Sequence, residues 1–130
     1  MKKKEADFAI IGGGIVGLSV AHGLLKQGCS VICIDGSDTD FRASRGNFGL
    51  VWVQGKGIRT PFYAAWTQNA ARIYPDFVSE LSQETGVQIN YNQAGGYEYF
   101  TEPHVLSQRM DEYKQLKKAL NDDYPYELRN

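Results

Sequence analysis

Three glycines spaced as Gly12-x-Gly14-x-x-Gly17 carry the strongest chemical signal in the sequence. They follow an apolar segment and open a helical pattern, and Asp35 ends the next apolar segment. This is the context in which such glycines hold a dinucleotide. Gly12 would permit a tight turn, Gly14 would let the backbone approach a pyrophosphate, and Gly17 would allow close helix–sheet contact. The amino end of the helix would then face the phosphates, and Asp35 would accept hydrogen bonds from ribose hydroxyls.

A second polar segment runs from Arg42 to Leu50 (RASRGNFGL). Its two arginines can pair with phosphate oxygens, and Ser44 can donate a further hydrogen bond. Taken alone, the segment would favour a solvated, charged loop. Together with the glycine pattern, it favours a phosphate-binding loop.

The elements that must position these residues are a strand, a helix and a second strand. Residues 7–11 (DFAII) and 30–35 (SVICID) predict two short buried strands. Residues 14–27 carry a wide apolar stripe, which is typical of a helix packed on a sheet, and Gly28 is expected to end that helix. The order predicts a βαβ unit with parallel strands and a right-handed crossover.

The second half of the chain predicts a mixture of helices and strands. A helix is expected from residue 60 to about residue 86, kinked or split at Pro75, and an amphipathic helix is expected to begin at Pro103. Three further short strands are expected at residues 50–53, 87–91 and 96–101, the last two as a hairpin.

Composition and charge exclude several functions. The chain has 130 residues, of which 42% are hydrophobic and 22% charged, as in ordinary soluble domains. Its net charge of -1 provides no field for nucleic acid, so no nucleic-acid partner is expected. The apolar residues 8–21 are too few and too interrupted by glycine to cross a bilayer, so no transmembrane segment is expected.

Cysteine and histidine provide no further site. Cys29 and Cys33 would point along one strand face, too far apart for an easy bridge, which predicts free thiols and a cytoplasmic location, with peripheral membrane association left open. His22 and His104 have no ligand-spaced partners, so no metal site is expected.

The chain resembles a known family over nearly its whole length. Residues 7–35 (DFAIIGGGIVGLSVAHGLLKQGCSVICID) are similar to the N-terminal βαβ unit of the FAD-dependent D-amino-acid oxidase and glycine oxidase group. RASRGNFGLVW is similar to the group's second cofactor-contacting segment, and TGVQINYNQAGGYEYF to its passage into the substrate domain. FGLVWVQGKG resembles opine oxidase and the flavoprotein subunits of proline and hydroxyproline dehydrogenases in particular.

The resemblance implies non-covalent FAD, because the family's covalent-flavin variants carry a histidine near Ser44 and Arg45, where this chain has none. It places the backbone N–H groups of Ile15 and Val16 on the pyrophosphate. The cofactor-binding residues expected from the motifs and the resemblance are Gly12, Gly13, Gly14, Ile15, Val16, Gly17, Asp35, Gly36, Arg42, Ala43, Ser44, Arg45, Asn47, Phe48, Gly49 and Leu50.

The function that the resemblance implies is oxidation of an amino or imino acid by hydride transfer to flavin. The substrate would be a D-amino acid, glycine or sarcosine, proline or an opine. Family members have several hundred residues, so the chain is expected to be the N-terminal third of such an enzyme and inactive by itself. Other subunits of a hetero-oligomeric dehydrogenase are candidate partners, and no catalytic residue is expected in this part.

The expected fold class is α/β, a Rossmann-like FAD-binding βαβ unit with the beginning of an α+β substrate domain. We place the FAD-binding portion at residues 1–85 and the start of the substrate domain at 86–130, both incomplete. Two alternatives stay open. An NAD-dependent dehydrogenase fragment is one, because flavoproteins of this type more often have Glu where Asp35 stands. A non-catalytic truncated remnant is the other, because half of the flavin site is unbuilt.

Overall fold

A computed structural model of the chain describes residues 5–37, 39 and 42–129. The chain forms two compact units, Met1–Leu50 (unit 1) and Val51–Asn130 (unit 2). The units are defined by their compactness. The functional boundary expected after residue 85 is a different division and stays a prediction.

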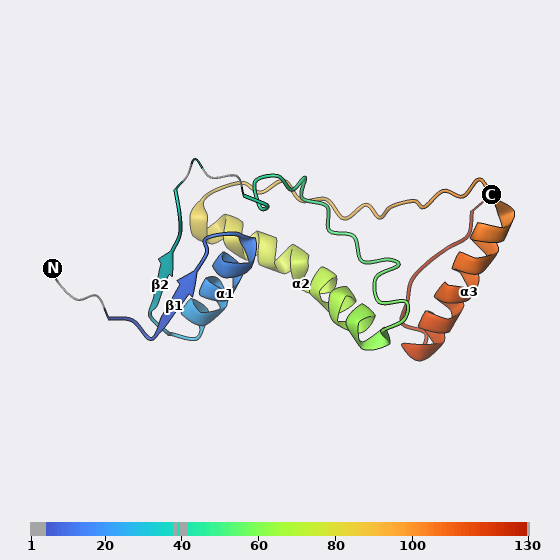
Figure 1. Cartoon of the computed structure of the whole chain (residues 1–130), viewed down its shortest axis with the longest axis horizontal. Coiled ribbons are helices and arrows are strands. Elements are labelled where there is room, and N and C mark those ends of the chain that lie inside the picture. Colours follow the sequence, from blue (N-terminus) through green and yellow to red (C-terminus); the bar gives the residue numbers. More distant parts are fainter. Residues whose placement is uncertain (1–4, 38, 40–41, 130) are drawn as a thin grey trace. The chain divides into compact units, whose positions relative to one another are not determined.

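Unit 1 consists of β1 (Phe8–Ile11), α1 (Ile15–Lys26) and β2 (Val31–Ile34) (Figure 1). The two strands are parallel, and their register runs from the pair Phe8 and Val31 to the pair Ile11 and Ile34. Helix α1 contacts both strands. Each element lies within its predicted range, so the predicted order of strand, helix and parallel strand is confirmed.

The ends of these elements are fixed by local chemistry. Gly28 has a φ of +81°, a left-handed conformation that ends α1 as predicted. At the start of the sheet, the Asp7 carboxylate accepts hydrogen bonds from the Ser30 backbone N–H at 2.8 Å and from the Ser30 hydroxyl at 2.6 Å. These bonds join the residue before β1 to the residue before β2.

The strands of unit 1 are not buried, so that part of the prediction is wrong. Ile11 is 88% exposed and Ile34 is 53% exposed. Among the described residues of unit 1, Ala21 in α1 alone is buried. Continuously apolar strands are typical of sheets that are covered on both faces. Here a single helix, α1, packs on the two strands, and much of their apolar surface stays uncovered.

The described residues of unit 2, 51–129, contain two helices, α2 (Pro61–Thr85) and α3 (Pro103–Ala119). Each has a proline in its first turn, where the missing N–H costs no helical hydrogen bond. Helix α2 ends at Gly86, which has a φ of +69°. Pro75 lies inside α2, and the helix continues through it. The two predicted helices are therefore confirmed, and Pro75 does not split the first.

The three strands predicted after residue 49 are absent from the part of unit 2 that the structure describes. Residues 87–101 form an extended, unpaired trace between α2 and α3 (Figure 1). A strand requires a neighbouring backbone to complete its ladder. Trp52 and Gly96 do approach each other, because a Cβ on Gly96 would collide with the Trp52 ring, but no backbone ladder joins their segments.

A small aromatic core holds unit 2 together. Its buried members are Ala64, Tyr113, Leu116 and Tyr124. The Gly55 backbone N–H donates to the Tyr124 hydroxyl at 2.6 Å, and the Tyr113 hydroxyl donates to Glu98 at 2.8 Å. Tyr113 and Leu116 lie on α3, so the amphipathic helix predicted to begin at Pro103 contributes two of its residues to this core.

Candidate functional site

The glycines of the motif lie between the end of β1 and the first turn of α1. Gly12 has a φ of +105°, which side-chain-bearing residues rarely adopt, so the tight turn requires glycine there. A Cβ on Gly17 would collide with the Gly12 carbonyl oxygen. A Cβ on Gly14 would lie 3.1 Å from the Ser44 hydroxyl. The tight turn at Gly12 and the close packing at Gly17 therefore lie where the spacing predicted them.

The amino end of α1 faces the turn formed by residues 42–46. The Ile15 backbone N–H donates to the Ser44 hydroxyl at 2.9 Å. The backbone of the helix closes first at Leu18, whose N–H donates to the Gly14 carbonyl at 2.9 Å. The N–H groups before Leu18 therefore sit at the positive end of the helix dipole, which favours an anion.

Asp35 follows β2 and receives three kinds of donor. They are the Gly13 backbone N–H, the Arg42 guanidinium and the Gly36 backbone N–H, which lies 2.9 Å from Oδ1. In this order of importance, these donors hold the pKa of the Asp35 carboxyl below its usual range. A Cβ on Gly13 would lie 2.5 Å from Oδ2, so this approach also requires a glycine.

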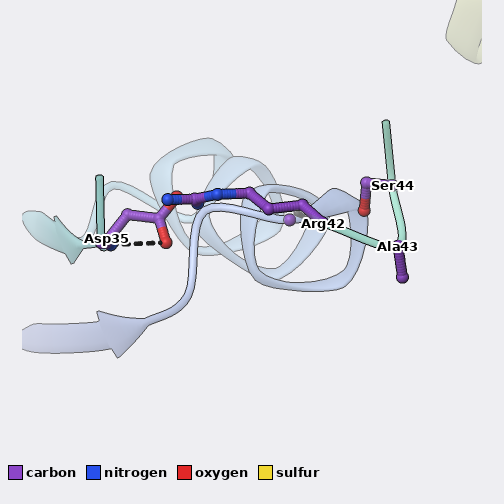
Figure 2. A pocket seen from close by; sticks show the side chains of 6 residues that line it. Asp35, Arg42, Ala43 and Ser44 are labelled. Atoms are coloured by element: carbon purple, nitrogen blue, oxygen red, sulfur yellow. Dashed lines mark hydrogen bonds and ion pairs between the residues drawn. The ribbon is translucent and has the colours of Figure 1, made fainter. Parts of the chain in front are cut away.

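These groups line one pocket in unit 1 (Figure 2). Its lining residues are Gly14, Asp35, Gly36, Arg42, Ala43 and Ser44, and its volume is about 380 Å³. Figure 2 shows the Arg42 side chain extended toward Asp35, with Ser44 further along the same loop. The volume is within the range of small-molecule sites, about 300–1,000 Å³. The fold thus brings together residues from both motifs that the sequence singled out.

The later residues of the second motif do not line this pocket. Phe48 is 86% exposed and Leu50 is 61% exposed. Asn47 uses its side-chain oxygen within its own segment, where it accepts from the Gly49 N–H at 2.6 Å. Arg45 is also not among the lining residues. The structure therefore places only the first three residues of RASRGNFGL at the pocket.

Sequence reasoning missed two contacts of the site. It gave Gly13 no task of its own, although the Gly13 N–H is the main cause of the lowered Asp35 pKa. It also assigned Arg42 to phosphate, whereas Arg42 pairs with Asp35. Asp35 and Arg42 are separated by a segment whose sequence has no periodic pattern. The only available signal was the presence of an acid and an arginine at the two ends of that segment.

A comparison with family models identifies the chain. The model of the FAD dependent oxidoreductase family (DAO) matches residues 7–129. The chain belongs to this family. The family is FAD-dependent, and FAD is the cofactor expected from the sequence. The match extends through both units of the structure.

Three curated members of the family give the scale of the likeness. An opine oxidase subunit of Rhizobium meliloti is 39% identical over 94% of this chain and 33% of its own length. Mitochondrial dimethylglycine dehydrogenase of Rattus norvegicus is 31% identical over 86% of this chain and 12% of its own length. Glycine oxidase of Bacillus licheniformis is 23% identical over 72% of this chain and 25% of its own length. No solved structure matches significantly.

The chain spans about a third of the length of the opine oxidase subunits that it matches. Within the described residues, no group of three or more histidine, cysteine, aspartate or glutamate side chains is arranged to hold a metal ion. None of the helices that the structure describes has the length and apolar character needed to cross a membrane.

Proposed function

We propose that unit 1 is the Rossmann-like start of an FAD-binding domain and that it holds the adenosine diphosphate part of non-covalent FAD. The observation that carries this proposal is the amino end of α1, where Gly14 leaves the backbone open beside Ser44 in a chain of an FAD-dependent family. A helix start beside a pocket fits a diphosphate, because oriented N–H groups and the dipole both favour negative charge.

The diphosphate would lie against the first turn of α1. Of the two backbone N–H groups expected on the pyrophosphate, that of Ile15 already donates to the Ser44 hydroxyl at 2.9 Å, so Val16 would make the direct contact and Ile15 would act through Ser44. The Ser44 hydroxyl accepts from Ile15, so its own proton stays available to donate to a phosphate oxygen. Gly14 supports this arrangement because a Cβ would occupy the gap between the helix and the Ser44 hydroxyl.

The ribose of the adenosine would lie at Asp35 and Gly36, which line the same pocket. A carboxylate has about four acceptor positions. Gly13, Gly36 and Arg42 each take one, which leaves capacity for a ribose hydroxyl. This fit supports the predicted role of Asp35, whose carboxylate also accepts hydrogen bonds from the protein itself.

The remaining residues of the proposal rest on residue type and on the family resemblance. Arg45 and Asn47 would complete the loop beside the diphosphate, and Phe48 to Leu50 would run beside the flavin end. Non-covalent attachment is supported by the absence of histidine in the segment RASRGNFGL. Residues 86–130 would begin an α+β substrate domain.

The reaction we propose is oxidation of an amino or imino acid, with FAD supplying the two-electron acceptor when it is bound. The names of the relatives support this substrate class, since they act on opines, dimethylglycine and glycine. One relative is a subunit, so further subunits are proposed partners. The free thiols of Cys29 and Cys33 are consistent with the proposed cytoplasmic location.

A titration of the purified chain tests this proposal. We expect saturable binding of one FAD per chain, seen as quenched flavin fluorescence, with ADP as a competitor because the site contacts the adenosine diphosphate half. NAD should compete no better than ADP. Selective binding of NAD would favour the dehydrogenase alternative. A folded chain that binds no FAD at high micromolar concentration would favour the non-catalytic remnant.

A further inference from the structure

The Arg42 guanidinium is engaged by the protein itself. Nη1 donates to the Asp35 carboxylate, and Nη2 donates to the Ser37 carbonyl oxygen at 2.7 Å. Nε is buried and has no hydrogen-bond partner among the described residues. The whole side chain is 18% exposed. Both terminal nitrogens of Arg42 therefore donate to the protein itself, although the residue lines the pocket.

Arg42 also begins the turn that carries Ser44. The Arg42 carbonyl oxygen accepts from the Arg45 N–H at 3.1 Å and from the Gly46 N–H at 3.2 Å. The Ser44 hydroxyl, inside this turn, accepts from the Ile15 N–H. One end of the turn is therefore anchored at Asp35 after β2, and its middle reaches the start of α1.

Asp35 is the point at which three segments meet. Its carboxylate receives the Gly13 N–H from the β1–α1 turn, the Gly36 N–H from its own segment, and Arg42 from the turn of residues 42–46. A charge-assisted pair of this kind is stronger than a bond between neutral groups and restricts geometry. Loss of Arg42 would release the turn from β2, and with it the position of Ser44.

We propose that Arg42 is a positioning residue: its pair with Asp35 holds the turn of residues 42–46 against the amino end of α1, and FAD affinity depends on Arg42 through the position of Ser44. This inference rests on the proposed function. It replaces the direct phosphate contact that the residue types suggested for Arg42. A lysine can bind phosphate as a point charge but lacks the fork that joins Asp35 and Ser37.

Amide hydrogen exchange in the cofactor-free chain tests the anchor without any ligand. We expect exchange at Ile15 to accelerate about two- to tenfold in Arg42→Gln and Arg42→Lys, as in Ser44→Ala, which is the range for loss of one hydrogen bond. Gly12, whose N–H donates to the Ile34 carbonyl at 2.8 Å, should keep its protection and so report an intact sheet. Unchanged exchange at Ile15 in both Arg42 variants would overturn the proposal.

FAD titration of the same variants tests the consequence. Arg42→Lys should weaken FAD binding as much as Arg42→Gln, and the double variant Arg42→Gln/Ser44→Ala should bind no more than about twofold more weakly than Ser44→Ala alone. The charge-matched control Lys118→Gln, on an exposed position of α3, should leave affinity unchanged. Wild-type affinity in Arg42→Lys, or multiplying effects in the double variant, would instead show direct phosphate contact.

The two readouts separate the two proposals. If the wild-type chain binds no FAD, the proposed function fails, and exchange at Ile15 still decides whether Arg42 positions the turn. If FAD binds but Ile15 exchange is insensitive to Arg42, the site is correct and the positioning role is wrong.

Discussion

At the scale of single residues, unit 1 combines glycines that serve the backbone with one charged side-chain pair, Asp35 and Arg42. Gly12 and Gly17 lie where the motif requires a tight turn and close packing, because these needs are local and recur wherever the motif occurs. The pair between Asp35 and Arg42 joins residues seven positions apart, and no periodic pattern in the sequence predicts that they meet. The residue type gives Arg42 its charge and its donors, whereas its partner is known only from the folded structure.

The link between Asp7 and Ser30 gives a pH-dependent prediction. The Ser30 hydroxyl and then the Ser30 N–H hold the pKa of Asp7 below its ordinary value of 3.8. The folded state thus binds this proton more weakly than the unfolded state. The stabilisation is present above pH 3.8 and is lost as pH falls through the lower, folded-state pKa.

Asp7→Asn should therefore destabilise unit 1 at pH 7, and the difference from wild type should shrink at lower pH, below the folded-state pKa. Amide exchange in β1 and β2 is the suitable measurement, because Trp52 and Trp66 both lie in unit 2 and would not report on this sheet. A gap between variant and wild type that stays constant with pH would contradict the assignment.

At the scale of elements, amphipathic pattern and end signals predicted what forms locally. Helices α1, α2 and α3 and the strands β1 and β2 all lie where the sequence placed them. The strands expected at 50–53, 87–91 and 96–101 failed for a different reason. Their composition suits a sheet, but a strand exists only when a neighbouring backbone completes its ladder, and their sequence does not specify that neighbour.

Two glycines of α1 make a matched pair for testing how the helix packs on the strands. A Cβ on Gly17 would collide with the Gly12 carbonyl oxygen, whereas a Cβ on Gly23 would meet nothing within 4 Å. Gly17→Ala should destabilise unit 1 by about 1–3 kcal/mol through overpacking. Gly23→Ala should stabilise it by about 0.5–1 kcal/mol, because alanine restricts the unfolded chain and suits a helix interior.

Urea denaturation followed by amide exchange in α1 would measure both changes in the free energy of unfolding. Equal stability of the two variants would show that the helix does not approach the β1–α1 turn as closely as this structure has it.

At the scale of the whole molecule, the chain is a family member for which we propose one half of a cofactor site in unit 1. The family match extends over residues 7–129, while the length covered is about a third of the opine oxidase subunits. The strands of unit 1 are apolar and exposed. Such continuously apolar strands are typical of sheets whose two faces are both covered. Family and cofactor were predictable because they are encoded in contiguous motifs, whereas burial depends on segments that pack from elsewhere.

FAD affinity of Gly14→Val is the most direct test of the central claim. The backbone of Gly14 has a φ of -77°, which valine can adopt, so the substitution adds side-chain bulk without forcing the turn. We predict that the wild-type chain and Gly23→Ala bind FAD alike, and that Gly14→Val loses at least about tenfold in affinity, or 1.4 kcal/mol, while its circular dichroism is unchanged. Equal FAD affinity in wild type and Gly14→Val would contradict a diphosphate bound at the start of α1.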